Sequence, residues 1–166
     1  MDLAASSTLP VIDLAGLGTT AGDAAIGRAL DAAFRDVGFC YFVGTGIAAG
    51  LVEAVFAASR QFHALPGAAR QAIAMNRFHR GYMAPRTSLI ETSTVARVTR
   101  PNDSESFMLM HEVPQGDPRF GTPLNGPNQW PAALPGFRAA VAGYDTALRQ
   151  FCHRLLRPIA LALDLP

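Results

Sequence analysis

The sequence has few of the features that would place a protein outside the ordinary globular class. Only two cysteines occur in 166 residues, and fourteen basic residues nearly balance thirteen acidic ones. No run of about 18 apolar residues is uninterrupted, and the first residues contain neither a basic segment nor a long apolar segment. These absences argue against a disulfide scaffold, a nucleic-acid-binding surface, a membrane span and a secretory signal, so we expect a soluble cytoplasmic protein.

The composition that is present is typical of one folded domain. Hydrophobic residues make up 49% of the chain and charged residues 16%. A chain of this size is expected to bury roughly 68–70% of its unfolded surface. Cys40 and Cys152 lie within apolar segments, and we therefore expect both thiols to be buried.

The hydrophobic periodicity changes along the chain and predicts a mixture of helices and short strands. Between residues 23 and 37 the large apolar residues recur every three or four positions, which indicates a helix. The segment "GFCYFVG" is rich in aromatic residues and bounded by glycines, which favours a buried strand. The predicted strands are 10–14, 38–44 and 104–113, and the predicted helices before the last one are 23–37, 49–63 and 65–75.

A long final helix is the strongest local prediction. Its apolar stripe continues for about 27 residues, or ~40 Å at 1.5 Å per residue. Pro135 suits the first turn, and Trp130, in the rigid stretch "GPNQWPAALPGFR", is expected to pack over the helix entrance. Pro158 predicts a kink near Arg154. The stripe consists of Phe137, Val141, Tyr144, Leu148, Phe151, Leu155, Ile159 and Leu163.

The glycine-rich segment "VGTGIAAG" (43–50) suggests a phosphate-binding turn, but the details argue against one. The pattern is GxGxxxG instead of GxGxxG. The segment after the next helix also lacks the apolar strand and acidic residue of a dinucleotide-binding unit. A plain strand-to-helix turn is the favoured interpretation.

Other chemistry-bearing residues also have an ordinary structural explanation. The four histidines form no HxD pair and no helical His pair, so a complete metal site is not expected. Asp103 and Glu105 could form a catalytic carboxylate pair, but acids in a polar turn are usually solvated. Arg77 and Arg80 could clamp a substrate carboxylate, although surface arginines are more common.

Five sequence segments, considered in the order in which they occur, indicate a protein family. The segments "LPVIDLAGL", "ALDAAFRDVGFCYFVGTGI", "FHALPGAARQAIAMNRFHRGYMAP", "SESFMLMHEVP" and "NQWPAALPGFRAAVAGYDTALRQFCHRLLRPIALALDLP" occur in this order and cover nearly the whole chain. Together they resemble the N-terminal portion of the isopenicillin N synthase-like family. Members are non-haem iron oxygenases, and most of them use 2-oxoglutarate.

The resemblance implies a fold class of α+β, with N-terminal helices and short strands ending in a long helix that supports a jelly-roll core. Residues 1–166 correspond to the N-terminal region, and most of that core is absent. The family binds Fe(II) through HxD and a distant His, and 2-oxoglutarate through Arg-x-Ser. This chain has no position for these motifs, so no catalytic or metal-binding residue is assigned, and neither group is expected to bind this chain alone. Thr45 also replaces the His of a common Asn-His-Gly turn.

The resemblance does imply candidate substrate contacts. Phe107 and Leu109 alternate along a strand that lines one pocket wall in the family, with Tyr82 nearby and Arg80 as a candidate for a substrate carboxylate. Two hypotheses remain open: part of an oxygenase that hydroxylates or desaturates a small organic substrate using O₂, or a truncated binding or interaction module. Because the long apolar helix would lack its partner sheet, self-association of the isolated chain is expected.

Overall fold

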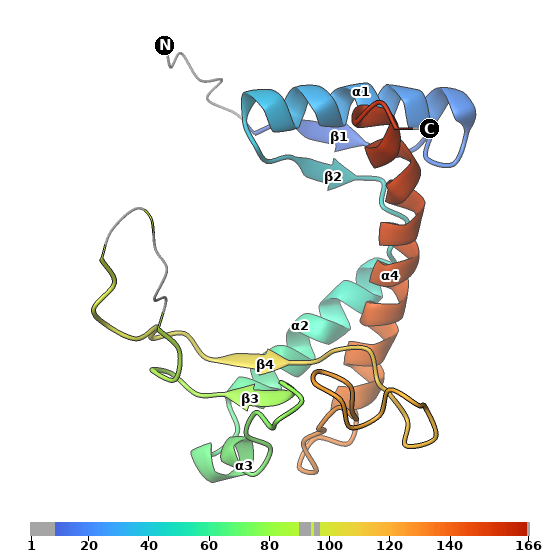
Figure 1. Ribbon diagram of the computed structural model, residues 1–166. Helices are drawn as coiled ribbons and strands as arrows, with labels where there is room; N and C mark the ends of the chain where they lie inside the picture. The colour runs from blue at the N-terminus through green and yellow to red at the C-terminus, as the bar shows by residue number, and fades with distance from the viewer. Residues whose placement is uncertain (1–8, 90–93, 95–96, 166) are drawn as a thin grey trace. The chain divides into compact units, whose positions relative to one another are not determined.

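The structure is a computed structural model that describes residues 9–89, 94 and 97–165. The chain divides into two units, one formed by Met1–Glu53 with Ala142–Pro166 and the other by Ala54–Val141. The elements in chain order are β1 (Val11–Asp13), α1 (Thr20–Asp36), β2 (Tyr41–Val43), α2 (Ala49–His63), α3 (Gly67–Gln71), β3 (Gly81–Met83), β4 (Ser106–Met108) and α4 (Phe137–Ala162) (Figure 1). This mixture confirms the α+β class.

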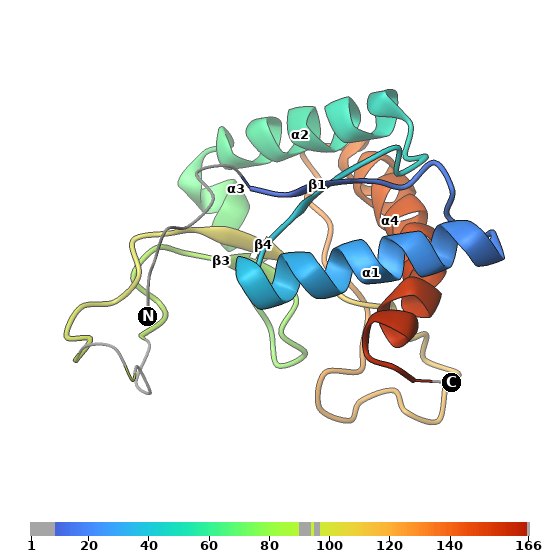
Figure 2. The same cartoon turned by 90° about the horizontal axis from the view of Figure 1, so that it is seen from above.

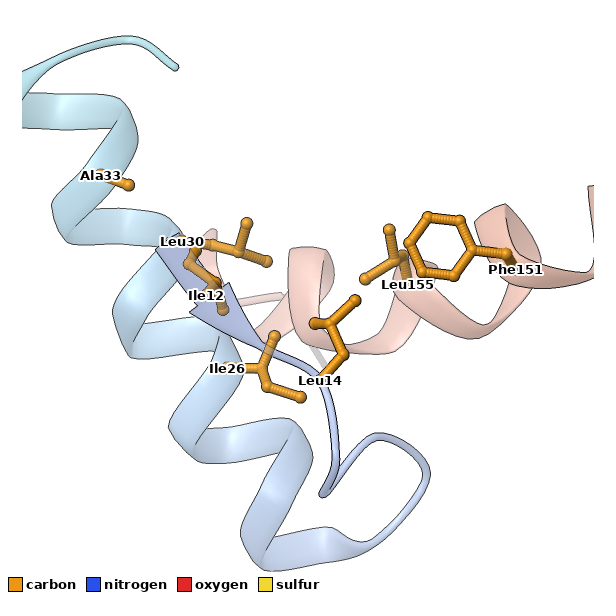
Figure 3. Packing of buried hydrophobic residues seen from close by; sticks show 7 residues of the cluster. All are labelled: Ile12, Leu14, Ile26, Leu30, Ala33, Phe151 and Leu155. Carbon is orange, nitrogen blue, oxygen red and sulfur yellow. The ribbon is translucent and has the colours of Figure 1, made fainter. Parts of the chain in front are cut away.

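The first unit is built on a parallel pair of strands joined by a helix. β1 pairs with β2, with Val11 opposite Tyr41 and Ile12 opposite Phe42. Figure 2 shows α1 running alongside this pair. One face of the pair packs into an apolar core with α1 and the second half of α4. Figure 3 shows the buried members of this core, which are Ile12, Leu14, Ile26, Leu30, Ala33, Phe151 and Leu155.

Helix α1 begins where its N-terminal groups find partners. The Thr19 hydroxyl accepts a hydrogen bond from the Gly22 backbone N–H, which satisfies one of the free donors of the first turn. Asp23 accepts from the Gly18 N–H at 2.8 Å and lies 3.4 Å from Arg157 of α4. An acidic side chain at this end also complements the helix dipole. These contacts fix the start of α1 at residue 20, three residues before the predicted start.

The second unit contains the end of α2, α3, the β3–β4 pair and the first residues of α4. β3 and β4 are antiparallel, and Tyr82 lies opposite Phe107. Trp130 packs against Phe137 with ring centroids 6.3 Å apart, which confirms its expected place at the entrance of α4. The buried core residues are Ala58, Phe62, Tyr82, Phe137 and Val141.

Two predictions of burial in the first unit are wrong. Residues 38–44 do not form a buried strand, because β2 spans three residues and leaves Phe39, Tyr41 and Val43 exposed. The β1–β2 pair is covered on one face only, so alternate side chains point outward. Cys152 is exposed and Cys40 is partly buried. Cys152 follows the buried Phe151 by one position, which turns it away from the core face of α4.

The apolar stripe of α4 is buried or half-buried from Phe137 to Leu155, whereas Ile159 and Leu163 are exposed. The helix begins at Phe137, so Pro135 lies in the turn before it and not in its first turn. α4 continues as one helix past Pro158, whose side chain is fully buried. Nothing in the described segments is both long enough and apolar enough for a membrane-crossing helix.

Candidate functional site

The second unit contains an apolar pocket of about 180 Å³. Residues from α2, from β4 with the residue after it, and from the start of α4 line it, so three stretches that are distant in sequence meet there. All the lining side chains belong to Ala54–Val141. They are Val55, Ser59, Phe62, His63, Phe107, Leu109, Phe137 and Val141.

The pocket is floored by a cluster of aromatic rings centred on Phe62, which is fully buried. Its ring centroid lies 5.1 Å from that of Phe107 and 5.4 Å from that of Phe137. Phe107 and Phe137 meet edge to face with centroids 5.0 Å apart. Aromatic pairs in these arrangements contribute about 0.5–1.5 kcal/mol each beyond their buried area. The three rings therefore form a closely packed apolar floor.

The carboxylate of Glu105 contacts three side chains beside the pocket. Glu105 Oε1 lies 2.8 Å from His63 Nδ1. Glu105 Oε2 accepts hydrogen bonds of 2.5 Å from the Arg70 guanidinium and of 2.5 Å from the Tyr82 hydroxyl. The Arg70 guanidinium also lies 5.3 Å from the centre of the Tyr82 ring. One side chain thus connects α2, α3 and β3.

These contacts shift the pKa values of two members of the cluster. The pKa of Glu105 is lowered, mainly by the hydrogen bond from Tyr82, with further contributions from His63 and Arg70 that outweigh desolvation. The pKa of Tyr82 is raised, first by its hydrogen bond to Glu105 and then by desolvation. Glu105 is therefore held as a carboxylate while Tyr82 is held as a neutral phenol.

The structure brings together three of the four candidate residues. Phe107 and Leu109 line the same pocket, as the alternation along β4 predicts. Tyr82 lies beside them in the core, with its hydroxyl on Glu105. β4 is shorter than expected, at residues 106–108 instead of 104–113. Leu109 therefore lies just beyond the end of the strand.

The expectation that Arg80 binds a substrate carboxylate needs a correction. Arg80 lies outside the pocket lining, and its guanidinium binds backbone carbonyls. The side chain is 1% exposed. Its two terminal nitrogens donate 2.8 Å hydrogen bonds to the backbone carbonyls of Phe78, Leu124 and His111. This geometry ties three loop segments together, and the burial of the side chain keeps it from a substrate carboxylate. Arg77, its expected partner in a clamp, is exposed and stacks on Phe78.

Sequence reasoning missed His63 and undervalued Glu105. Asp103 is exposed and paired with Arg86 at 2.7 Å, as a solvated acid should be. Glu105, two residues later, lies at the edge of β4 with a side chain only 27% exposed. The alternation that places Phe107 and Leu109 on one face places Glu105 there as well. The alternation could therefore have predicted from the sequence that Glu105 lies beside Phe107 and Leu109.

The described residues contain no group of three His, Cys, Asp or Glu side chains able to hold a metal ion. The part of the chain seen in the structure therefore does not fit the iron site of the family. The glycine-rich segment is a strand-to-helix connection, with Gly44 and Gly46 at positive φ and the Thr45 carbonyl accepting from Arg154.

Comparisons with known proteins give a consistent answer. The family model described as "non-haem dioxygenase in morphine synthesis N-terminal" matches residues 9–133. Azadirone synthase LFS of Melia azedarach is 32% identical over 135 residues, which cover 80% of this chain and 40% of that protein. Homoarginine-6-hydroxylase 2-ODD-C23.1 of Arabidopsis thaliana is 30% identical over 168 residues, which cover 94% of this chain and 48% of that protein. The chain thus spans less than half the length of these relatives.

Solved structures show the same fold. A 2OG-Fe(II) oxygenase family protein from Caulobacter crescentus matches with a TM-score of 0.75 at 22% identity, over 96% of this chain and 50% of that one. A full-length Neurospora crassa protein, solved in complex with alpha-KG, matches with a TM-score of 0.73 at 23% identity, over 95% of this chain and 47% of that one. The resemblance seen in the sequence is confirmed, and the chain belongs to the N-terminal family of non-haem dioxygenases.

Proposed function

We propose that this chain is the N-terminal, substrate-facing part of an Fe(II)- and 2-oxoglutarate-dependent oxygenase that hydroxylates or desaturates a small organic substrate. The observation that carries the proposal is that Phe107 and Leu109 line one pocket, in which the ring of Phe107 packs against that of Phe62. The names of the relatives support it, since they include a hydroxylase and a 2-oxoglutarate-Fe(II) type oxidoreductase.

In this proposal the described residues bind and orient the substrate and take no part in metal chemistry. Phe107 and Leu109 contribute apolar contact, and Tyr82 supports Phe107 from the opposite strand. Their contribution to affinity comes from removing apolar surface from water, about 25 cal/mol per Å². Iron and 2-oxoglutarate would be held by a part of the protein outside these residues.

The test begins with the coding sequence beyond the codon for Pro166. If it encodes HxD, a distant His and Arg-x-Ser, the longer protein is expressed, and succinate formation from 2-oxoglutarate is measured with Fe(II) and a panel of small substrates. The proposal predicts substrate-stimulated succinate formation. A longer protein with these motifs but no 2-oxoglutarate turnover would refute the proposal, and so would an immediate stop codon.

The pocket wall is tested in the same protein by changing both Phe107→Ala and Leu109→Ala. We expect the apparent KM for the substrate to rise at least about tenfold, because two apolar contacts are lost. Phe56→Ala is the matched control, since Phe56 lies on the same helix as the floor residue Phe62 but is exposed and outside the pocket. An unchanged KM in the double variant would remove Phe107 and Leu109 from the substrate site.

A further inference from the structure

The pocket has a mostly apolar lining, so its few polar side chains can determine which ligands it binds. Only Ser59 and His63 among its eight lining residues carry hydrogen-bonding side chains. Ser59 is exposed, whereas His63 is partly buried and held on both sides. Its Nδ1 lies 2.8 Å from Glu105, and its ring meets Phe62 edge to face with centroids 5.1 Å apart. The imidazole is therefore fixed in orientation.

The hydrogen bonds of Glu105 determine which ring nitrogen of His63 carries a proton. A carboxylate can only accept hydrogen bonds. Glu105 accepts from Arg70 and Tyr82 on Oε2, so Oε1 must accept from His63. Nδ1 is then the protonated nitrogen, and Nε2 of the neutral ring carries a lone pair. Glu105 contacts Nδ1 and not Nε2, so this pairing does not use Nε2.

An oriented lone pair beside an aromatic floor recognises a particular kind of ligand. Apolar pockets use a small number of placed polar groups to fix orientation and specificity. The partly exposed ring of Phe107, backed by the buried rings of Phe62 and Phe137, favours a planar ring over a flexible chain. A cavity of about 150 Å³ is enough to hold benzene. This pocket, at about 180 Å³, has room for a single substituted ring.

We propose that His63 is the specificity-determining residue of this pocket and accepts a hydrogen bond through Nε2 from a hydroxyl or N–H group on a small planar substrate. Glu105 acts through His63 as a positioning residue. This inference rests on the proposed function, because it assigns a substrate class to the same pocket.

The test compares the binding of phenol and anisole to the chain Met1–Pro166 by NMR titration at about pH 8, where imidazole in water is neutral. Both probes carry oxygen on a benzene ring, but only phenol can donate a hydrogen bond. We expect phenol to bind about three- to tenfold more tightly than anisole. His63→Phe should abolish this preference, whereas Ser59→Ala should retain it.

A second readout separates positioning from simple loss of structure. The ¹⁵N shifts of the His63 ring report which nitrogen is protonated, and we expect Nδ1–H in the wild type. Glu105→Gln should produce a mixture of the two tautomers and reduce the phenol preference, while the chain stays folded. Wild-type His63 with its proton on Nε2 would overturn the proposal.

Three further results would overturn it: equal affinity for phenol and anisole, a preference that survives His63→Phe, or binding of neither probe in the pocket. These outcomes are independent of catalysis. A longer protein without 2-oxoglutarate turnover would refute the proposed function even if the phenol preference were found. Turnover without a phenol preference would refute only the role of His63.

Discussion

The hydroxyl of Tyr82 lies 2.5 Å from Glu105 Oε2, and this hydrogen bond is the main reason why the pKa of Glu105 is lowered. Removing it with Tyr82→Phe should reduce the free energy of unfolding by about 1.5–3 kcal/mol, the usual contribution of a hydrogen bond to a charged group. Urea denaturation at about pH 7 measures the change. No loss of stability would mean that the hydrogen bond makes no net contribution.

The same cluster predicts how stability depends on pH. Because the pKa of Glu105 is below its ordinary value of 4.5 in the folded chain, its contribution is present above that value and is lost as the pH falls through the folded pKa. The pKa of Tyr82 is raised above 10.0, so its contribution is present below that value and is lost as the pH rises through the folded pKa. Tyr82→Phe should weaken the acid dependence and remove the alkaline one, which urea unfolding across the pH range would reveal.

Phe62 should be the most sensitive aromatic residue of α2. Its side chain is fully buried, so Phe62→Ala leaves a cavity and should cost about 3–5 kcal/mol. Phe56→Ala on the same helix removes a ring that is 61% exposed and should change stability by less than about 0.5 kcal/mol. Thermal or chemical unfolding of both variants provides the comparison. Similar losses in the two variants would contradict the packing described here.

Arg80 and Arg77 should respond differently to the same change. Arg80→Lys replaces a forked group that reaches three carbonyls with a single charged nitrogen, and we expect a loss of about 2–4 kcal/mol. Arg77→Lys changes an exposed side chain and should have little effect. An Arg80→Lys variant of wild-type stability, measured by urea unfolding, would show that the buried guanidinium is replaceable.

Self-association of the isolated chain was expected from the apolar stripe of α4, but most of that stripe is covered, and we predict that any association uses the outer face of the β1–β2 pair instead. Val11 and Tyr41 are each 61% exposed and lie directly opposite each other. Changing both to threonine should shift the sedimentation profile toward monomer, since threonine keeps strand propensity but removes apolar surface. Leu89→Thr is a control at another exposed apolar residue. A wild-type chain that is monomeric at high concentration would contradict the prediction.

Features that depend on neighbouring residues were predictable from the sequence, whereas features that depend on distant partners were not. α2 was predicted with its observed bounds, because its period is local. That Phe107 and Leu109 face the same side was also predictable, since alternation is a property of one strand. Arg80 and Glu105 were misjudged because their partners lie up to 44 and 42 residues away. Burial of a charged side chain depends on such distant partners, which no local pattern reveals.

The division of the chain has a consequence for its synthesis. The core of the first unit joins Ile12 and Leu14 to Phe151 and Leu155, which are synthesised much later than they are. The second unit is one continuous stretch, Ala54–Val141. Since the N-terminal end emerges from the ribosome first, β1 and α1 must wait with an uncovered apolar face until the second half of α4 arrives. The middle of the chain can therefore fold before its N-terminal segment, whose apolar face stays exposed to water in the interval.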